Sequence, residues 1–224
     1  MSWDTTWKGL GEPRPRPDPE SYVEHVWSSQ PPQLLETAVS TGALLGDLTT
    51  RQSMRRFGAI DPRDLSALLW SVAGCKQSVD SPMGFALERR GAPSAGAIHP
   101  IHILICDPLT RALHRYDGQA HALESLACAA PKPMLEMFMA ILPFDAATLL
   151  LFVAEPGKTA AKYSDPISLV LRDAGVLQGL IAFAAEALKL NFCLLGATGD
   201  PWIAQLSQEG KLRGVGAALV GSRA

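Results

Sequence analysis

The sequence lacks a strong net charge and the common signatures of nucleotide and hydrolase sites. Its 20 lysines and arginines nearly balance 22 aspartates and glutamates, which gives a net charge of −2 at pH 7. No broad positive field is therefore available to attract nucleic acid or an anionic membrane surface. The chain also contains no P-loop, no GxGxxG fingerprint and no GxSxG elbow. Any anion site must be local, and clustered arginines are where to look for it.

Cysteine is scarce and shows no pairing pattern. Cys75, Cys106, Cys128 and Cys193 have no CxxC spacing and no histidines at the spacing of metal ligands, so we expect no metal site. Cys106 and Cys193 lie in apolar runs, which favours buried thiols in a reducing compartment. The N-terminal residues contain no apolar secretion segment. We therefore predict a cytoplasmic protein.

What the chain does contain is a folded body preceded by a proline-rich arm. Apolar residues make up 47% and charged residues 19% of the 224 residues, which is typical of a globular protein with a sizeable core. Residues 12–19 alternate proline with charge, which predicts an extended polyproline II chain. Aromatic residues flank this stretch and favour packing onto the chain's own body or onto a partner; the alternative is a loosely ordered tail. We divide the chain into the arm, residues 1–45, and the body, residues 46–224.

Apolar periodicity in the body predicts a mixture of helices and strands. A helix is expected from Asp61 and Pro62, a typical capping pair, to a stop at Gly74. Asp117-Gly118 predicts a hairpin with a type I′ turn, whose second strand begins at residue 119. Further strands are predicted at residues 101–106, 148–154, 192–196 and 216–221. The body is therefore expected to be an α+β domain.

The longest apolar segment, residues 166–190, predicts the central helix. Asp165 and Pro166 are expected at its N-cap and first position. Apolar side chains cover nearly every face, which is typical of a buried helix or a membrane span, and charged residues interrupt it too often for a span. Gly175 and Gly179 each cost about 1 kcal/mol relative to alanine, so we expect close packing on their face.

Arginines cluster at the start of the body, in the sequence Arg-Gln-Ser-Met-Arg at residues 51–55. In a helical turn Arg51 and Arg55 share one face, and their forked donors suit a phosphate. The Ser53 hydroxyl suits a ribityl chain, and the threonines at 49–50 would cap the helix towards the same anion. The alternative is a solvated basic turn, which is the more frequent structure for such a segment taken alone.

Two further segments could carry chemistry. Small residues at 93–97, in the sequence Pro-Ser-Ala-Gly-Ala, would let backbone amides approach a planar ligand, although an ordinary turn has the same composition. Lys162-Tyr163 could supply a proton donor and acceptor if burial moves their pKa values, although surface pairs of this kind are common. His99 and His102 have no carboxylate or thiol at ligand spacing, which argues against a metal.

The order of these segments resembles the nitroreductase superfamily, and within it the SagB-type dehydrogenase branch, which includes azoline oxidases. Arg-x-Ser-x-Arg, Pro-Ser-Ala-Gly-Ala, Lys-Tyr and Leu-x-Asp-Ala-Gly follow one another, and the match runs from Thr49 to Arg223. The resemblance implies an α+β homodimer with FMN at each subunit interface. It also implies a central mixed or antiparallel sheet, flanked by helices, with a long buried helix.

The resemblance also implies roles for individual residues. The phosphate and ribityl contacts fall on Arg51, Gln52, Ser53 and Arg55, with Arg223 as a C-terminal residue that reaches the phosphate. The loop against the isoalloxazine ring falls on Pro93, Ser94, Ala95 and Gly96, and a backbone approach to the ring falls on Gly196 and Ala197. Lys162 and Tyr163 match the pair held to be catalytic in azoline oxidases. His99 stands where the branch commonly has tyrosine, and is the candidate substrate residue.

These implications favour an FMN-dependent oxidoreductase, a dehydrogenase or oxidase in natural-product or peptide modification, for example of azolines to azoles. The alternatives are an NAD(P)H-dependent nitro- or quinone reductase, and a non-catalytic flavin-binding scaffold that docks through the arm. Expected partners are a second copy of the chain, a small-molecule or peptide substrate, and a biosynthetic partner protein. Neither nucleic acid nor a membrane is expected as a partner.

Overall fold

The fold is built around one antiparallel sheet. The computed structural model describes residues 14–15, 17–27, 33–35, 51–107, 109–207 and 211–223. Seven strands lie in the order β10-β11-β8-β5-β6-β7-β2, and every neighbouring pair is antiparallel. The strands of this sheet are β2 (Gln33–Leu34), β5 (Ile101–Cys106), β6 (Ala112–Asp117), β7 (Ala122–Ala129), β8 (Thr148–Ala154), β10 (Leu190–Leu195) and β11 (Arg213–Ser222). Two smaller pairs join β1 (Arg14–Pro15) to β9 (Tyr163–Ser164) and β3 (Gln77–Val79) to β4 (Leu87–Arg89).

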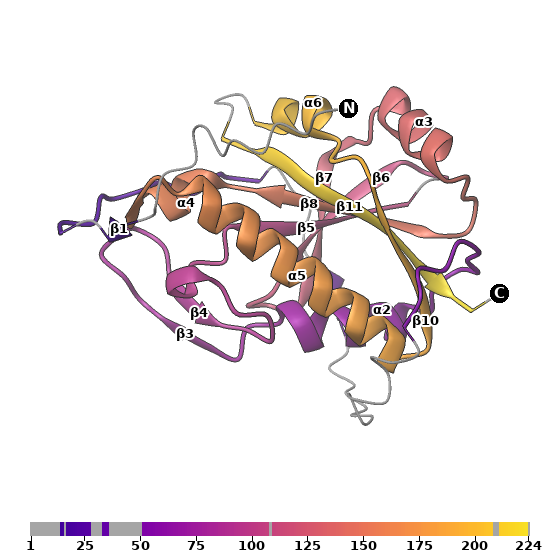
Figure 1. Ribbon diagram of the computed structural model, residues 1–224, viewed down its shortest axis with the longest axis horizontal. Helices are drawn as coiled ribbons and strands as arrows, with labels where there is room; N and C mark the ends of the chain where they lie inside the picture. The colour runs from indigo at the N-terminus through magenta and orange to yellow at the C-terminus, as the bar shows by residue number, and fades with distance from the viewer. Residues whose placement is uncertain are drawn as a thin grey trace, which may run out of the picture.

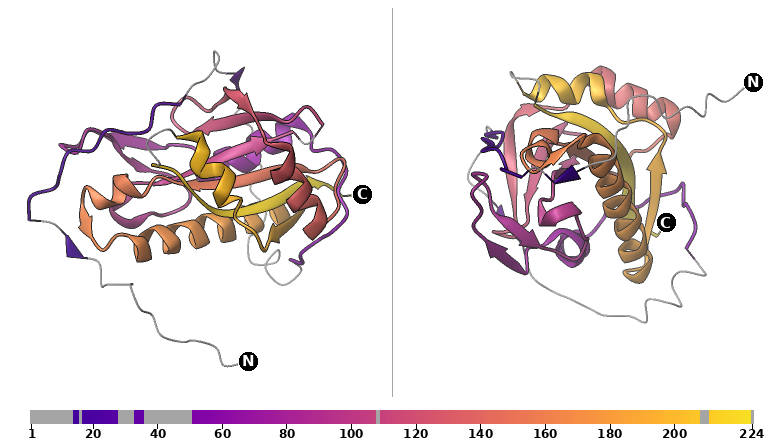
Figure 2. Two further views of the ribbon diagram at one scale, coloured as in Figure 1. Left: turned by 90° about the horizontal axis from the view of Figure 1, so that it is seen from above. Right: turned by 60° about the vertical axis from the view of Figure 1, so that its left-hand side comes forward.

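Helices cover both faces of this sheet, as Figures 1 and 2 show. They are α2 (Pro62–Ala73), α3 (Lys132–Ile141), α4 (Pro156–Ala160), α5 (Ile167–Ala187) and α6 (Asp200–Ile203), with short 3-10 turns at η1 (Ala95–Ala97) and η2 (Ala204–Leu206). Along the central strand β8, Leu150 and Phe152 enter a core shared with α2 and α5. Leu149 and Leu151 enter the opposite core, against α3 and α6. Alternation along one strand thus separates two cores.

Most of the predicted elements of the body are confirmed. In α2, the Asp61 side chain accepts a hydrogen bond from Arg63 N, Pro62 is the first residue, and Gly74 follows the last. Strands β5 and β8 have the predicted bounds, and β10 and β11 contain the predicted strands or most of them. The chain is α+β, as expected.

The predicted hairpin forms, but its turn is longer than a type I′ turn. Strand β7 begins at Ala122, whereas the second strand was expected at residue 119. The Asp117 carboxylate accepts hydrogen bonds from Gln119 N and Ala120 N, which closes a local turn on that side chain. The left-handed residue is then His121, with φ 50°, and Gly118 is not left-handed.

Helix α5 is buried along one face only. It begins at Ile167 with Pro166 as its N-cap, one residue later than expected, because Asp165 has φ 52° and cannot start the helix. Its outer face carries Ile167, Leu171 and Val176, whose exposed fractions are 47%, 50% and 40%. A Cβ added at either helix glycine, Gly175 or Gly179, would meet nothing within 4 Å, so the expected close packing is absent among the described residues.

The composition of α5 is explained by packing on the sheet and by this apolar outer face. By length and hydropathy alone, the 21-residue helix could also cross a membrane. Its inner residues Val170, Ala174 and Leu177 belong to the core that contains β5 and β8. The outer face is partly exposed in the single chain.

The described part of the arm lies against the body of its own chain. Strand β1 pairs with β9, and Tyr22 N donates to Met83 O at 2.8 Å. The remaining residues of the predicted arm, 1–45, lie outside the described ranges, as do residues 49–50, which were expected to cap a helix.

Candidate functional site

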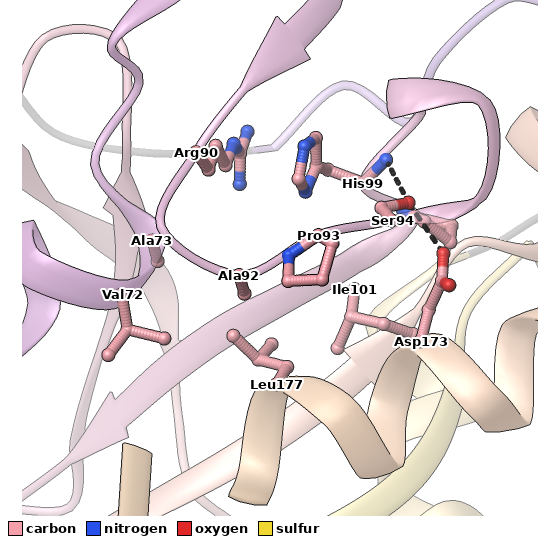
Figure 3. Close-up of a pocket in the computed structure, with 11 residues that line it drawn as sticks. Val72, Ala73, Arg90, Ala92, Pro93, Ser94, His99, Ile101, Asp173 and Leu177 are labelled. Atoms are coloured by element: carbon pink, nitrogen blue, oxygen red, sulfur yellow. Dashed lines mark hydrogen bonds between the residues drawn. The ribbon is translucent and has the colours of Figure 1, made fainter. Parts of the chain in front are cut away.

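The small-residue loop is tied to α5 by one carboxylate. Ser94 Oγ donates to Asp173 Oδ2 at 2.5 Å (Figure 3). Ala95 N donates to Asp173 Oδ1 at 3.1 Å. Ser94 Oγ also accepts from His99 N at 2.9 Å. Burial raises the pKa of Asp173, although the Ser94 and Ala95 hydrogen bonds oppose the shift. Sequence reasoning assigned Asp173 to the long helix but missed this tether.

Lys162 and Tyr163 meet this loop at Gly96. Gly96 has φ 66°, a left-handed conformation that favours glycine. A Cβ added there would lie 2.9 Å from both Lys162 Nζ and Tyr163 Oη. Lys162 Nζ lies 5.7 Å from the centre of the Tyr163 ring. Two motifs far apart in the sequence are therefore in contact, as a shared site requires.

His99 is buried beside the same loop. Its Nε2 lies 2.8 Å from Glu88 O, and because a carbonyl oxygen only accepts, Nε2 carries the hydrogen and Nδ1 the lone pair. Burial, together with the Arg90 guanidinium, lowers the pKa of His99 to about 4. The imidazole is therefore neutral near pH 7 and available as a hydrogen-bond acceptor at Nδ1.

Two hollows adjoin the loop. A small, partly open cavity of about 20 Å³ lies behind it, between α2 and α5, with room for about one water molecule. Figure 3 shows Arg90, His99 and Asp173 around this cavity. An open, mainly apolar pocket of about 640 Å³ lies between the loop and the β3–β4 hairpin. Residues that line it include Val79, Leu87, Arg89, Arg90, Pro93 and His99.

The arginine segment is not helical, contrary to expectation. Residues 51–57 follow the edge strand β10 as irregular chain, in which Met54 N donates to Phe192 O at 3.1 Å. Asn191 Nδ2 also donates to Arg56 O at 2.7 Å. Met54 N and Arg56 O, which a helical turn would need for its own hydrogen bonds, are thus bonded to strand β10. Gln52, Ser53 and Arg55 are exposed, and Arg51 is half-buried.

Arg223 lies at the same end of the sheet as the arginine segment. Gly58 and Ser222 exchange two backbone hydrogen bonds, each 3.0 Å long, which places Arg223 beside the end of that segment. Its guanidinium pairs with Glu186 in the last turn of α5 at 2.9 Å. Arg223 is therefore next to the end of the arginine segment, and its guanidinium is bound by Glu186. We call the arginine segment, residues 51–55, and Arg223 the basic group.

The two groups of predicted site residues lie at opposite ends of α5. The loop is held at Asp173 and Arg223 at Glu186, which are about 20 Å apart along a helix axis. Figure 1 shows β3 and β4 at one end of the molecule and β10 with the C-terminus at the other. Gly196 is exposed after β10, and a Cβ added there meets nothing within 4 Å; Ala197 is half-buried beside it. One chain alone does not enclose these groups in a single pocket.

The other polar clusters give no sign of a metal centre. Among the described residues, no group of three or more histidines, cysteines, aspartates and glutamates could hold a metal ion. Cys106 and Cys193 are buried free thiols, as expected, whereas Cys128 is exposed.

Comparison with solved structures identifies the fold. No protein-family model and no curated protein matches the sequence. A candidate nitroreductase from Ralstonia eutropha JMP134 is similar with a TM-score of 0.66 and 21% identity, over 92% of this chain and 98% of that one. The microcin synthetase McbBCD complex of Escherichia coli, solved with truncated pro-MccB17 bound, contains a chain with a TM-score of 0.59 and 15% identity, over 85% of this chain and 77% of that one. A Bacteroides fragilis nitroreductase with bound FMN has a TM-score of 0.50 and 16% identity, over 82% and 90% of the two chains. The chain thus has a nitroreductase-like fold.

Proposed function

We propose that this protein is an FMN-dependent oxidoreductase, a cytoplasmic dehydrogenase or oxidase that modifies a natural product or peptide, for example an azoline. The observation that carries the proposal is the convergence of Lys162 Nζ and Tyr163 Oη on Gly96. This contact joins the candidate catalytic pair to the loop that the family resemblance assigns to the flavin ring. A similar fold holds FMN in the Bacteroides fragilis structure, and a similar fold occurs in the microcin synthetase complex.

The residues present fit FMN by their chemistry. The loop from Pro93 to Gly96 is made of small residues, and its tip leaves no room for a Cβ beside Lys162 and Tyr163, so the backbone itself would face the ring. Gly196 and Ala197 offer a second short stretch of small residues. Phosphate and ribityl hydroxyls would be held by Arg51, Gln52, Ser53, Arg55 and Arg223. Bound FMN would supply an acceptor for a hydride.

The site would be completed by a homodimer. In each chain, Asp173 near the start of α5 holds the small-residue loop, and Glu186 in the last turn of α5 pairs with Arg223 of the basic group. Two such helices packed antiparallel along their apolar outer faces would place the loop of one chain near the basic group of the other. The open space at Gly175 and Gly179 would let the backbones approach closely. Burial of Ile167, Leu171 and Val176 would supply a hydrophobic driving force.

The protein's part in azoline oxidation would be to take one proton. Conversion of an azoline to an azole breaks two C–H bonds: one hydrogen leaves as a hydride and the other as a proton. Lys162 Nζ and Tyr163 Oη lie together at the loop, where whichever of the two is in its deprotonated form would receive that proton and pass it to solvent. His99 Nδ1, neutral and buried next to the open pocket, would accept a hydrogen bond from the substrate. A peptide substrate would be presented by a biosynthetic partner protein.

The second candidate function is an NAD(P)H-dependent nitro- or quinone reductase. The observation in its favour is the open apolar pocket of about 640 Å³ beside the loop, a volume that suits a small planar acceptor. Rapid reduction of the flavin by NAD(P)H, without turnover of an azoline in the presence of oxygen, would select this function. A protein that binds FMN and turns over neither substrate would instead select the scaffold alternative.

The first experiment is to identify the cofactor and test the pair. The purified protein should carry flavin absorbance, and the released ligand should be FMN; a protein that stays colourless after incubation with FMN contradicts the proposal. Lys162→Ala and Tyr163→Phe should each slow oxidation of a model thiazoline by about 10²–10⁴-fold. Their affinity for FMN should stay unchanged. Arg55→Ala should weaken FMN binding, and Arg63→Ala, at an exposed arginine of α2, is the matched control.

A further inference from the structure

The N-terminal arm follows the segment that carries Lys162 and Tyr163. Strand β1 pairs antiparallel with β9, with Arg14 opposite Ser164 and Pro15 opposite Tyr163. Further along the arm, Glu20 N donates to Ala161 O at 2.8 Å. The arm thus runs forward while residues 155–164 run in the opposite direction beside it, and in Figure 1 β1 lies next to α4. We call residues 155–164 the pair-bearing segment.

The arm is anchored at the start of this segment by a buried carboxylate. Glu155 is 0% exposed and accepts hydrogen bonds from Tyr22 Oη and His102 Nε2, each at 2.9 Å, and from His25 N. Burial opposes ionisation of Glu155, but these hydrogen bonds outweigh it and lower its pKa to about 2. Loss of a donor would leave a buried charge poorly paired, which is costly. Two of the three donors come from the arm.

The packing around this anchor is as specific as its hydrogen bonds. A Cβ added at Gly157, in α4, would overlap the Tyr22 ring. That ring also contacts Phe85 edge-on, with centroids 6.4 Å apart. Next to it, the buried Lys158 pairs with Glu24 of the arm at 2.5 Å. Tyr22 is therefore seated directly on the short helix that leads to Lys162.

The opposite side of the segment faces the flavin loop. Lys162 Nζ and Tyr163 Oη each lie 2.9 Å from the position that a Cβ of Gly96 would occupy. The pair-bearing segment is therefore held between the arm and the loop. Among the described residues, the arm also contacts Met83 and Phe85, which form a small core with Ile98. Tyr163 packs against the same core, so this core and the pair-bearing segment are the two routes from the arm to the site.

We propose that the arm is a positioning element of the active site: Tyr22, seated on Gly157 and bonded to Glu155, holds Lys162 and Tyr163 against Gly96. This inference rests on the proposed role of Lys162 and Tyr163. Because a misplacement of a catalytic group by about 1 Å can cost about 100-fold in rate, a small shift of this segment should be visible in turnover. Tyr22 and Glu155 are positioning residues and not catalytic ones.

Two variants disturb the contact from its two sides. Gly157→Ala displaces the Tyr22 ring, although the same change in an unconstrained helix would stabilise it. Tyr22→Phe removes one donor to Glu155 and keeps the ring. The matched control is Tyr116→Phe, which removes a buried hydroxyl that lies 2.8 Å from His121 Nδ1 in another part of the fold. In the full chain, amide hydrogen exchange of residues 156–164 should become at least about tenfold faster in both variants and stay unchanged in the control.

Activity supplies the second readout. In the FMN-loaded protein, Gly157→Ala and Tyr22→Phe should lower kcat for the model thiazoline about tenfold or more, with FMN affinity unchanged. In a background with both Lys162→Ala and Tyr163→Phe neither variant should lower kcat further, because both positioned groups are gone. Unchanged hydrogen exchange overturns the inference and leaves the flavin proposal intact. A kcat loss that is undiminished in this double background also overturns it, since it would show a general structural effect. Absence of FMN binding in the wild type contradicts the proposed function instead.

Discussion

At the scale of single residues, Gly96 is constrained twice. Its φ of 66° is a conformation in which side chains other than glycine are strained. Its missing Cβ leaves the space that Lys162 Nζ and Tyr163 Oη approach to 2.9 Å. The backbone strain and the steric contact are independent, because the first exists in the isolated loop and the second only in the folded chain. Substitution at Gly96 should therefore affect stability and the site separately.

Gly96→Ala is the test of these two constraints. The left-handed backbone predicts a loss of about 1–2 kcal/mol in the free energy of unfolding, measured by chemical denaturation. The added Cβ should also displace Lys162 and Tyr163, so turnover should fall by more than a loss of folded protein explains. Arg63→Ala, at an exposed arginine of α2 outside the proposed site, is the control. Equal stability of the Gly96→Ala variant and the wild type would contradict the strain.

His99 predicts a pH dependence of stability. Burial, with Arg90, lowers its pKa from 6.5 to about 4. Between these values the unfolded chain binds the proton more readily than the folded chain, so stability is full above about pH 6.5 and falls as the pH drops towards 4. At about pH 4 and below, His99 should lower the free energy of unfolding by about 3 kcal/mol relative to its value above pH 6.5. Denaturation of the wild type and His99→Gln at pH 8 and pH 5 should show a smaller pH effect in the variant; parallel losses would contradict this.

At the scale of elements, α5 connects both halves of the candidate site. Its first half carries Asp173, which holds the ring loop, and its last turn carries Glu186, which pairs with Arg223. Its inner face packs on the sheet, and its outer face is apolar and partly exposed. A helix that serves both ends of a site also sets the distance between them. The exposed outer face is where a second chain would be expected to pack.

Leu171→Asp tests the outer face of α5. Leu171 is 50% exposed in the single chain, so a surface substitution there should change the stability of an isolated chain by no more than about 0.5 kcal/mol. If the face is a dimer interface, the introduced charge would be buried, and the variant should be monomeric by light scattering and lose FMN. Leu109→Asp, at a position 82% exposed, is the matched control. A dimeric, FMN-loaded Leu171→Asp variant would refute the helix-to-helix arrangement.

The elements also show what the sequence can and cannot predict. Helix α2 and strand β8 were predictable because a capping pair and a continuous apolar run are local signals. The arginine segment was wrongly expected to be helical, because the edge of β10 that engages Met54 is supplied by residues far along the chain. The contact of Lys162 with Gly96 was not predicted: the family resemblance assigned both residues to a flavin site, and only the structure places them side by side. The Asp173 tether was missed because a carboxylate on an apolar helix gives no local sign of its partner.

At the scale of the whole molecule, the two groups of predicted site residues face different ends. About 20 Å of helix separates the loop anchor from the Arg223 anchor. The charges of the chain nearly cancel, so the basic group is a local feature and not part of a general positive surface. Under the dimer proposal, a site built from both groups would use two chains, and each dimer would hold two such sites.

Mixing of two inactive variants should restore activity. Arg55→Glu damages the basic group, and Gly96→Ala damages the loop. After unfolding and refolding of an equal mixture, a heterodimer would carry one site with both defects and one with neither, so about a quarter of all sites should be intact. Thiazoline oxidation should return to about that fraction of the wild-type rate. Activity no higher than the mean of the two separate variants would show that each chain builds its own site.

The position of the two half-sites at opposite ends of α5 has a consequence for assembly in the cell. Under the dimer proposal, a newly made chain holds only half of each cofactor site, however well it has folded. Flavin loading then depends on encounters between chains, so its rate rises with the square of the chain concentration at low expression. At low expression, chains would remain without FMN even where FMN is abundant. The fraction of chains that hold FMN would therefore depend on how much of the protein the cell has made.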